Sequence, residues 1–116
     1  MKIAKRLLIV EDEFLIALEL EAILAGAGFE IVGPAETRAV ALQLIRDHTL
    51  DAAFLDYNLN GESSDDIAEA LLSKCVPFAF VTGYERETVP PAFMNAPVVG
   101  KPLVAATLLE IASGLT

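Results

Sequence analysis

Hydrophobic and polar positions alternate along the chain in blocks that predict strands and helices in turn. Short apolar runs, typical of buried strands, cover residues 6–10, 29–33, 52–55, 77–81 and 97–99. Stretches with apolar residues at helical spacing cover residues 13–25, 37–47, 64–74 and 103–113. Strands that alternate with helices in this way are typical of an α/β fold with a parallel sheet.

The pattern predicts a doubly wound five-stranded parallel sheet of the flavodoxin-like order 2-1-3-4-5, because crossovers between parallel strands are right-handed. A fourth helix would begin at residues 85–89, but Pro90, Pro91 and Pro97 interrupt it. We therefore expect that helix to be short or irregular. The length suits one domain, residues 1–116, and leaves no room for a second folded unit.

Local signals refine the boundaries of two helices. Residues 56–63 are expected to form a loop, and Ser64 is expected to cap the helix that follows. Asp65 and Asp66 fall in the first turn of that helix, where the helix dipole favours acids. Phe14, at the start of the first helix, is expected to pack against the fold rather than to bind a ligand.

Composition argues against several classes of function. The net charge is −9 and Lys and Arg form no cluster, which argues against a protein that grips the phosphate backbone of nucleic acid. No apolar stretch approaches the ~20 residues of a membrane span, and the N-terminus lacks the apolar region and cleavage site of a signal peptide. We expect a cytoplasmic protein with no membrane association, whose partners are cations or basic protein surfaces.

Four of the predicted strands end in polar residues. Glu11, Asp12 and Glu13 follow the first strand, Asp56 the third, Thr82 the fourth and Lys101 the fifth. In an open parallel sheet all strands deliver their C-terminal residues to one edge, so these groups are expected to converge. The predicted site holds carboxylates, a hydroxyl and an amine.

The acids of this site point to a metal ion. The first and third strands are neighbours in the predicted order, so Glu11, Asp12 and Asp56 would lie within a few ångströms of one another and repel. A hard divalent cation relieves that repulsion, and Mg²⁺ prefers one or two carboxylates together with waters and phosphate oxygens. A phosphorylated partner or product would supply the missing ligands. The alternative is that these acids are simply exposed to solvent at the strand ends and bind nothing. Thr82 and Lys101 at the adjacent strand ends argue against it.

The order of these groups along the chain closely resembles the receiver domain of two-component response regulators. That resemblance implies that Asp56 accepts a phosphoryl group from a histidine kinase or a histidine phosphotransfer protein. It also implies a Mg²⁺ site made by Glu11, Asp12, Asp56 and the backbone carbonyl of Asn58. The phosphorylated form is then read by a downstream protein partner.

The same resemblance assigns roles to the residues at the last two strand ends. Thr82 and Lys101 contact the phosphoryl group, Thr82 through its hydroxyl and Lys101 through its charge. A carboxylate such as that of Asp56 can attack phosphorus to form an aspartyl phosphate. The bond between Lys101 and Pro102, often cis in receivers, would fix the backbone at the lysine.

The chain departs from the common receiver pattern at two positions and resembles a subclass instead. The usual aromatic three residues before the lysine is Val98, and the usual proline four residues after the phosphoacceptor is Asn60. Residues 77–84 resemble the Pro-Phe-x-Phe-Ala-Thr-Gly-Tyr signature of alphaproteobacterial FATGUY receivers, with Val81 in place of alanine. Many members of that subclass are single-domain regulators with no output domain. Tyr84 is a candidate to replace the missing aromatic switch, or else a residue that only packs against its loop.

Other functions stay open at this point. A pseudo-receiver that acts only as an interaction module would be expected to have lost an acid, the threonine or the lysine, and none is lost here. A Mg²⁺-dependent phosphatase with an aspartyl nucleophile would carry Asp-x-Asp and a cap, whereas Asp56 is followed by Tyr57 and Asn58. A flavin-binding protein of this fold would have a phosphate-binding loop after the first strand, where this chain has acids. A phosphate shuttle, a phosphate sink and an allosteric effector are equally compatible with the sequence, and residues 84–107 are the expected partner interface.

Overall fold

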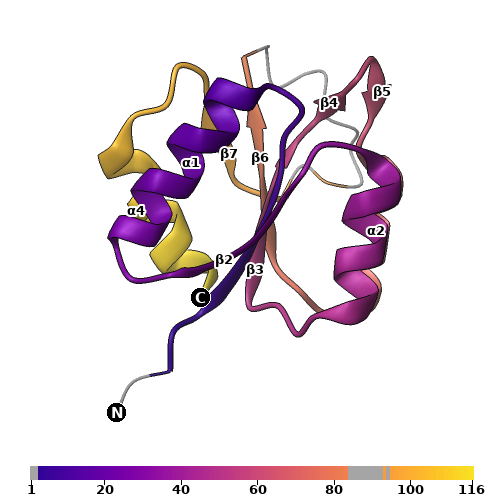
Figure 1. Cartoon of the computed structure of the whole chain (residues 1–116), viewed down its shortest axis with the longest axis horizontal. Coiled ribbons are helices and arrows are strands. Elements are labelled where there is room, and N and C mark those ends of the chain that lie inside the picture. Colours follow the sequence, from indigo (N-terminus) through magenta and orange to yellow (C-terminus); the bar gives the residue numbers. More distant parts are fainter. Residues whose placement is uncertain (1–2, 84–92, 94) are drawn as a thin grey trace.

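A five-stranded parallel sheet with helices on both faces forms the protein in the computed structural model, which describes residues 3–83, 93 and 95–116 (Figure 1). The strands of this sheet are β1 (Arg6–Val10), β2 (Glu30–Ala35), β3 (Ala52–Asp56), β6 (Phe78–Thr82) and β7 (Val98–Gly100). The helices of the described residues are α1 (Phe14–Gly26), α2 (Arg38–Asp47), α3 (Asp65–Ser73) and α4 (Ala105–Leu115). The strand order is β2-β1-β3-β6-β7, which confirms the predicted order 2-1-3-4-5 when the strands of this sheet are counted alone.

Two hydrophobic layers separate the sheet from its helices. On β1, Leu7 and Ile9 face one layer, which is closed by residues of α1 and α4, while Leu8 and Val10 face the other, which is closed by α2 and α3. Figure 1 shows α1 and α4 together on one side of the sheet and α2 on the other. Because both faces are covered, the central strand β3 is buried along its whole length, as expected for its continuous apolar run.

The segment predicted as a loop after the third strand contains a small hairpin. Strands β4 (Asn58–Leu59) and β5 (Glu62–Ser63) pair antiparallel across a two-residue turn. Asn60 and Gly61 in that turn have φ values of 54° and 84°. Successive positive φ angles with the sequence Asn-Gly are characteristic of a tight hairpin turn, which explains why the segment folds back on itself.

Two local predictions were wrong. Ser64 is the N-cap residue of α3, the position predicted for it, but its side chain makes no capping hydrogen bond because its hydroxyl donates to the backbone carbonyl of Asp56 instead. Phe14 does not pack against the core: the residue is 66% exposed, and the buried residues of α1 begin at Ala17. The prediction of Asp65 and Asp66 in the first turn of α3 is confirmed.

Helix and strand boundaries differ from the predicted ones by a few residues. Strand β2 continues to Ala35, two residues beyond the predicted end, and α4 covers Ala105–Leu115 rather than 103–113. The predicted irregular helix after β6 lies outside the described residues. Among the described helices, none combines the length and the apolar character that crossing a membrane requires.

Candidate functional site

The predicted acids, the hydroxyl and the amine lie at one edge of the sheet, where the strands end. Asp56 is the last residue of β3, Thr82 is the last residue of β6, and Lys101 directly follows β7. Glu11 and Asp12 directly follow β1, which is paired with β3. The structure therefore brings together the carboxylates, the hydroxyl and the amine of the strand ends.

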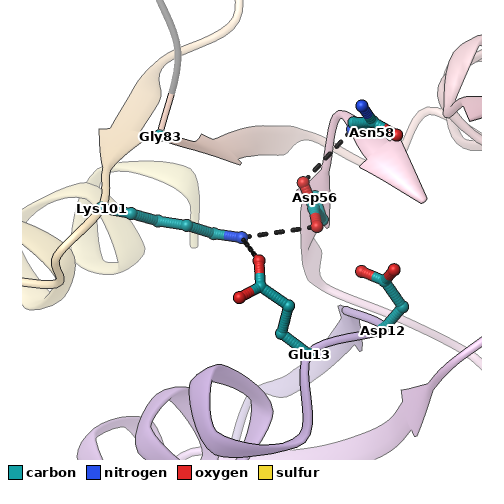
Figure 2. A pocket seen from close by; sticks show the side chains of 6 residues that line it. All are labelled: Asp12, Glu13, Asp56, Asn58, Gly83 and Lys101. Atoms are coloured by element: carbon teal, nitrogen blue, oxygen red, sulfur yellow. Dashed lines mark hydrogen bonds and ion pairs between the residues drawn. The ribbon is translucent and has the colours of Figure 1, made fainter. Parts of the chain in front are cut away.

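A cavity of about 450 Å³ opens at this edge (Figure 2). The residues that line it are Asp12, Glu13, Asp56, Asn58, Gly83 and Lys101. Figure 2 shows the side chain of Lys101 extending toward Asp56 and Glu13, while the carboxylate of Asp12 lies near that of Asp56 on the other side. A small anionic group could enter this cavity and reach both Asp56 and Lys101.

Glu11, Asp12 and Asp56 form a carboxylate cluster, in which one oxygen of each lies within 4.8 Å of the others. Glu11 and Asp56 are buried, at 0% and 5% exposure. Oε1 of Glu11 has no hydrogen-bond donor among the described residues, although it lies 3.1 Å from Nζ of Lys101. Mg²⁺ takes hard oxygen ligands of this kind, so the residues present fit that ion.

Lys101 supplies positive charge to the cluster. Its Nζ lies 3.1 Å from Oε1 of Glu11, 2.9 Å from Oε1 of Glu13 and 3.4 Å from Oδ2 of Asp56. The side chain is only 14% exposed, so these ion pairs are less screened than ordinary surface pairs. Lys101 is thus the cation nearest to Asp56 among the described residues, and its ammonium group lies beside three carboxyl groups.

Backbone and side-chain donors fix the orientation of Asp56. The N–H of Asn58 donates to Oδ1 of Asp56 at 3.2 Å, which leaves Oδ2 on the side of Lys101. The hydroxyl of Ser64 donates to the backbone carbonyl of Asp56, and the N–H of Ser64 donates to the carbonyl of Tyr57 at 2.9 Å. These contacts tie the end of β3 to the start of α3, so the Asp56 carboxylate projects from a fixed backbone.

The β4–β5 hairpin reaches Asp12 through Asn60. The N–H of Asn60 donates to Oδ2 of Asp12 at 3.0 Å, and the side-chain amide of Asn60 donates to the carbonyl of Glu36 at 2.9 Å. The side-chain oxygen of Asn58 accepts from the N–H of Gly61 at 3.0 Å within the same hairpin. The hairpin therefore orients one carboxylate of the cluster.

Burial raises the pKa of Glu11, and hydrogen bonding with Asp56 raises it further, from 4.5 to about 8. Burial also raises the pKa of Asp56, against the lowering effects of its hydrogen bonding with Glu11 and of the positive charge of Lys101. Two buried carboxyl groups so close together cannot both ionise easily. A bound cation would favour the loss of protons from both.

The pKa values of Asp12 and Lys101 shift toward their charged forms. Burial alone would raise the pKa of Asp12, but hydrogen bonds, led by the one from the N–H of Asn60, lower it below its usual 3.8. Burial alone would lower the pKa of Lys101, but its contacts with Glu13 and Glu11 outweigh burial and raise the pKa above its usual range. At neutral pH Asp12 is therefore ionised and Lys101 is protonated, so Asp56 lies between a negative and a positive charge.

Four further predicted residues are Thr82, Val98, Pro102 and Tyr84. Thr82 is buried, at 4% exposure, and Val98 is half-buried against the hydrophobic layer that α2 and α3 cover. The peptide bond between Lys101 and Pro102 is cis, as the receiver resemblance implied. Tyr84 lies outside the described residues, so its role as a switch stays a prediction.

Sequence reasoning missed three residues that shape the site: Glu13, Ser64 and Asn60. Glu13 was part of the acidic run, but its pairing with Lys101 joins positions 88 residues apart and leaves no local signal. Serine just before a helix favours a capping role, so the sequence does not indicate the bond from Ser64 to Asp56. Asn60 differs from the common receiver pattern by lacking a proline, and the dipeptide Asn60-Gly61 is a turn signal that could have indicated the hairpin.

Comparison with known proteins points to one group of signalling proteins. The phyllosphere-induced regulator PhyR from Methylorubrum extorquens is 35% identical to this chain over 95% of it. The solution structure of SdrG from Sphingomonas melonis Fr1 is 40% identical, with a TM-score of 0.87, and the match covers 99% of this chain and 98% of that one. A CheY-like response regulator receiver domain protein from Methanospirillum hungatei JF-1 is 28% identical, with a TM-score of 0.83, over 97% of this chain and 94% of that one. No family model matches the chain.

The chain spans less than half of the length of the curated relatives it matches. It covers 43% of PhyR, and 42% of the transcriptional regulatory protein PdtaR from Mycobacterium tuberculosis, which is 32% identical over 72% of this chain. SdrG, by contrast, is matched over almost its whole solved chain. A second SdrG structure, in the BeF3-activated conformation, matches this chain with a TM-score of 0.83.

Proposed function

The chain belongs to the response regulator receiver-domain family, and on that premise we propose that it accepts a phosphoryl group on Asp56. The donor is a histidine kinase or a histidine phosphotransfer protein in the cytoplasm. The protein is a signalling receiver, and the only reactions it promotes are its own phosphorylation and dephosphorylation.

One observation carries this proposal: Oδ2 of Asp56 lies 3.4 Å from Nζ of Lys101 and opens on the same cavity. An oxygen of Asp56 attacks the phosphorus of a phosphohistidine, and a P–O bond forms as the P–N bond breaks. The electron pair stays on the imidazole nitrogen, which takes up a proton from solvent. Lys101 neutralises charge that develops on the phosphoryl oxygens, and the hydroxyl of Thr82 donates to one of them.

Mg²⁺ is the expected cofactor, held by Glu11, Asp12, Asp56 and the backbone carbonyl of Asn58. The carboxylate cluster and the buried Oε1 of Glu11 without a hydrogen-bond donor support this assignment. When bound, Mg²⁺ supplies positive charge beside the phosphoryl oxygens. Two backbone N–H groups prepare the acids of the site: that of Asn60 helps to keep Asp12 ionised, and that of Asn58 orients Asp56.

We assign the chain to the FATGUY subclass and infer that it signals through a protein partner rather than through nucleic acid or a membrane. Residues 77–84, which match the subclass signature except at Val81, support the first assignment. Tyr84 takes the place of the missing aromatic switch, since Val98 occupies the usual aromatic position. The partner reads residues 84–107, of which the structure describes 93 and 95–107.

Amide NMR spectroscopy tests the proposal. Mg²⁺ is titrated into the protein first, and beryllofluoride, which mimics a phosphoryl group on a carboxylate, is added afterwards. We expect Mg²⁺ to shift the resonances of Glu11, Asp12 and Asp56, and beryllofluoride to shift those of Thr82 and Lys101. That a BeF3-activated conformation of SdrG has been solved makes beryllofluoride a suitable probe.

The matched variants for this experiment are Asp56→Asn and Asp47→Asn. Asp56→Asn should abolish the beryllofluoride response, whereas Asp47→Asn, an exposed acid at the end of α2, should leave it unchanged. If the wild-type protein binds Mg²⁺ but does not respond to beryllofluoride, the chain is a pseudo-receiver that acts only as an interaction module. The phosphatase alternative would show itself as Mg²⁺-dependent hydrolysis of phosphate esters with repeated turnover.

A further inference from the structure

Three carboxylates hold the ammonium group of Lys101, and Glu13 is the nearest of them. Nζ of Lys101 lies 2.9 Å from Glu13, compared with 3.1 Å from Glu11 and 3.4 Å from Asp56. Nζ donates hydrogen bonds to Glu13 and Asp56, and Glu11 lies within ion-pair distance of it. A phosphoryl group on Asp56 that needs Lys101 therefore competes with these acids for its ammonium group.

Glu13 is the acid that can most easily give up its contact with Lys101. Its side chain is 61% exposed, whereas those of Glu11 and Asp56 are 0% and 7% exposed. A carboxylate that leaves Lys101 for water keeps its hydration, while a buried carboxylate left without its cation does not. Release of Lys101 from Glu13 thus costs less free energy than release from either buried acid.

The backbone at Glu13 permits such a release. Glu13 is the N-cap residue of α1, but its side chain makes no capping hydrogen bond, so it is not tied to the helix. Its N–H donates to Oε2 of Glu11 at 3.1 Å, which fixes the main chain beside the acid cluster. The side chain can therefore rotate away from Lys101 while the backbone of the site stays in place.

We propose that Glu13 is a positioning residue that holds Lys101 in the unphosphorylated protein and releases it when a phosphoryl group forms on Asp56. This inference rests on the proposed function, because it assumes that a phosphoryl group is received. Glu13 opposes phosphorylation in two ways: it occupies the ammonium group, and it adds a negative charge to the cavity wall. Removal of its charge should therefore favour the phosphorylated form.

The affinity of the protein for beryllofluoride measures how strongly Glu13 opposes the phosphorylated form. At saturating Mg²⁺, we expect Glu13→Gln and Glu13→Ala to bind beryllofluoride about two- to fivefold more tightly than the wild type, the range expected for loss of a partly exposed ion pair. Glu19→Gln removes the same charge from an exposed position further along α1 and should leave the affinity unchanged. Two variants of Glu13 are used so that a folding defect in one does not decide the result.

A spectroscopic readout separates release of Lys101 from a merely structural role of Glu13. In the wild-type protein, the side-chain carboxyl carbon resonance of Glu13 should move when beryllofluoride is added, because the carboxylate loses its ammonium partner. The corresponding resonance of Glu19 should stay in place. If the Glu13 carboxyl resonance does not move while the amide of Thr82 responds, the inference is overturned.

The outcomes distinguish this inference from the proposed function. A wild-type protein that gives no beryllofluoride response contradicts the proposed function, and the inference about Glu13 fails with it. A wild-type protein that responds normally, together with Glu13 variants of equal or weaker affinity, overturns the inference alone. A tightening of similar size in Glu19→Gln would also overturn it, since the effect would then be one of net charge.

Discussion

The hydroxyl of Ser64 donates a hydrogen bond to the backbone carbonyl of Asp56, eight residues earlier in the chain. Ser64 is fully buried, and its N–H also donates to the carbonyl of Tyr57. The two bonds close the segment that contains the β4–β5 hairpin and anchor the end of β3. The start of α3 and the proposed phosphoacceptor are thereby held in one rigid arrangement.

Ser64→Ala should destabilise the protein by about 1–3 kcal/mol, because it leaves the buried carbonyl of Asp56 without its side-chain donor. Urea unfolding followed by circular dichroism measures the free energy of unfolding. Ser73→Ala is the matched control: the hydroxyl of Ser73 donates to the carbonyl of Ala70, but the bond is exposed, so we expect a loss below about 0.5 kcal/mol. Equal losses of unfolding free energy in the two variants would show that the buried Ser64 hydrogen bond stabilises the protein no more than the exposed Ser73 bond does.

The raised pKa values of Glu11 and Asp56 predict a pH dependence of stability. Glu11 keeps its proton in the folded protein up to about pH 8, whereas in the unfolded chain it ionises above its usual 4.5. Between these values the folded state binds more protons than the unfolded state, so the stability of the metal-free protein falls as pH rises. Thermal unfolding at several pH values across this window, in the presence of a chelator, measures the decline.

Mg²⁺ should reverse this trend, since it binds the ionised acids and therefore competes with their protons. We expect the increase in melting temperature on adding Mg²⁺ to be small at the acidic end of the window and larger near pH 8. Glu11→Gln is the control, because a glutamine cannot titrate and the decline without metal should become shallower. A decline of unchanged slope in Glu11→Gln would assign the effect to other groups.

Much of the fold was predictable because its determinants are local or periodic. The apolar run that ends at Val10 and the buried segment 52–55 identify strands from their own composition, and right-handed crossovers then fix the order. The strand ends placed Asp56 and Lys101 at one edge for the same reason. These features depend on the pattern of the chain and not on any particular side-chain contact.

The contacts around the site were less predictable, since they join positions that are far apart in sequence. Nothing near Glu13 indicates that it meets Lys101, and nothing near Ser64 distinguishes a helix cap from a donor to a preceding strand. The β4–β5 hairpin was hard to predict for a different reason. Its turn, Asn60-Gly61, carries a recognised signal, but two-residue strands are too short for hydrophobic alternation to reveal them.

Asn60 allows a test of how the hairpin supports Asp12. Asn60→Gly keeps the N–H that donates to Asp12 and tolerates the φ of 54°, so we expect Mg²⁺ affinity to change less than about twofold. Asn60→Pro removes that N–H and cannot adopt a positive φ, so it should weaken Mg²⁺ binding and destabilise the protein by about 2 kcal/mol or more. Calorimetric titration with Mg²⁺ and urea unfolding measure the two effects. Comparable Mg²⁺ affinities in the two variants would mean that the Asn60 N–H does not support Asp12.

Lys101→Met should change the two ligand affinities in opposite directions. The ammonium group of Lys101 competes with a cation for Glu11 and Asp56, so its removal should strengthen Mg²⁺ binding by about 1 kcal/mol or more, given that unit charges ~4 Å apart interact by ~4 kcal/mol near a protein surface. The same change removes the positive charge that faces a phosphoryl group, so the beryllofluoride response should be lost. Lys5→Met, at an exposed position before β1, should alter neither affinity. If Lys101→Met weakened both ligands while the protein stayed folded by circular dichroism, Lys101 would act by maintaining the shape of the site and not by its charge.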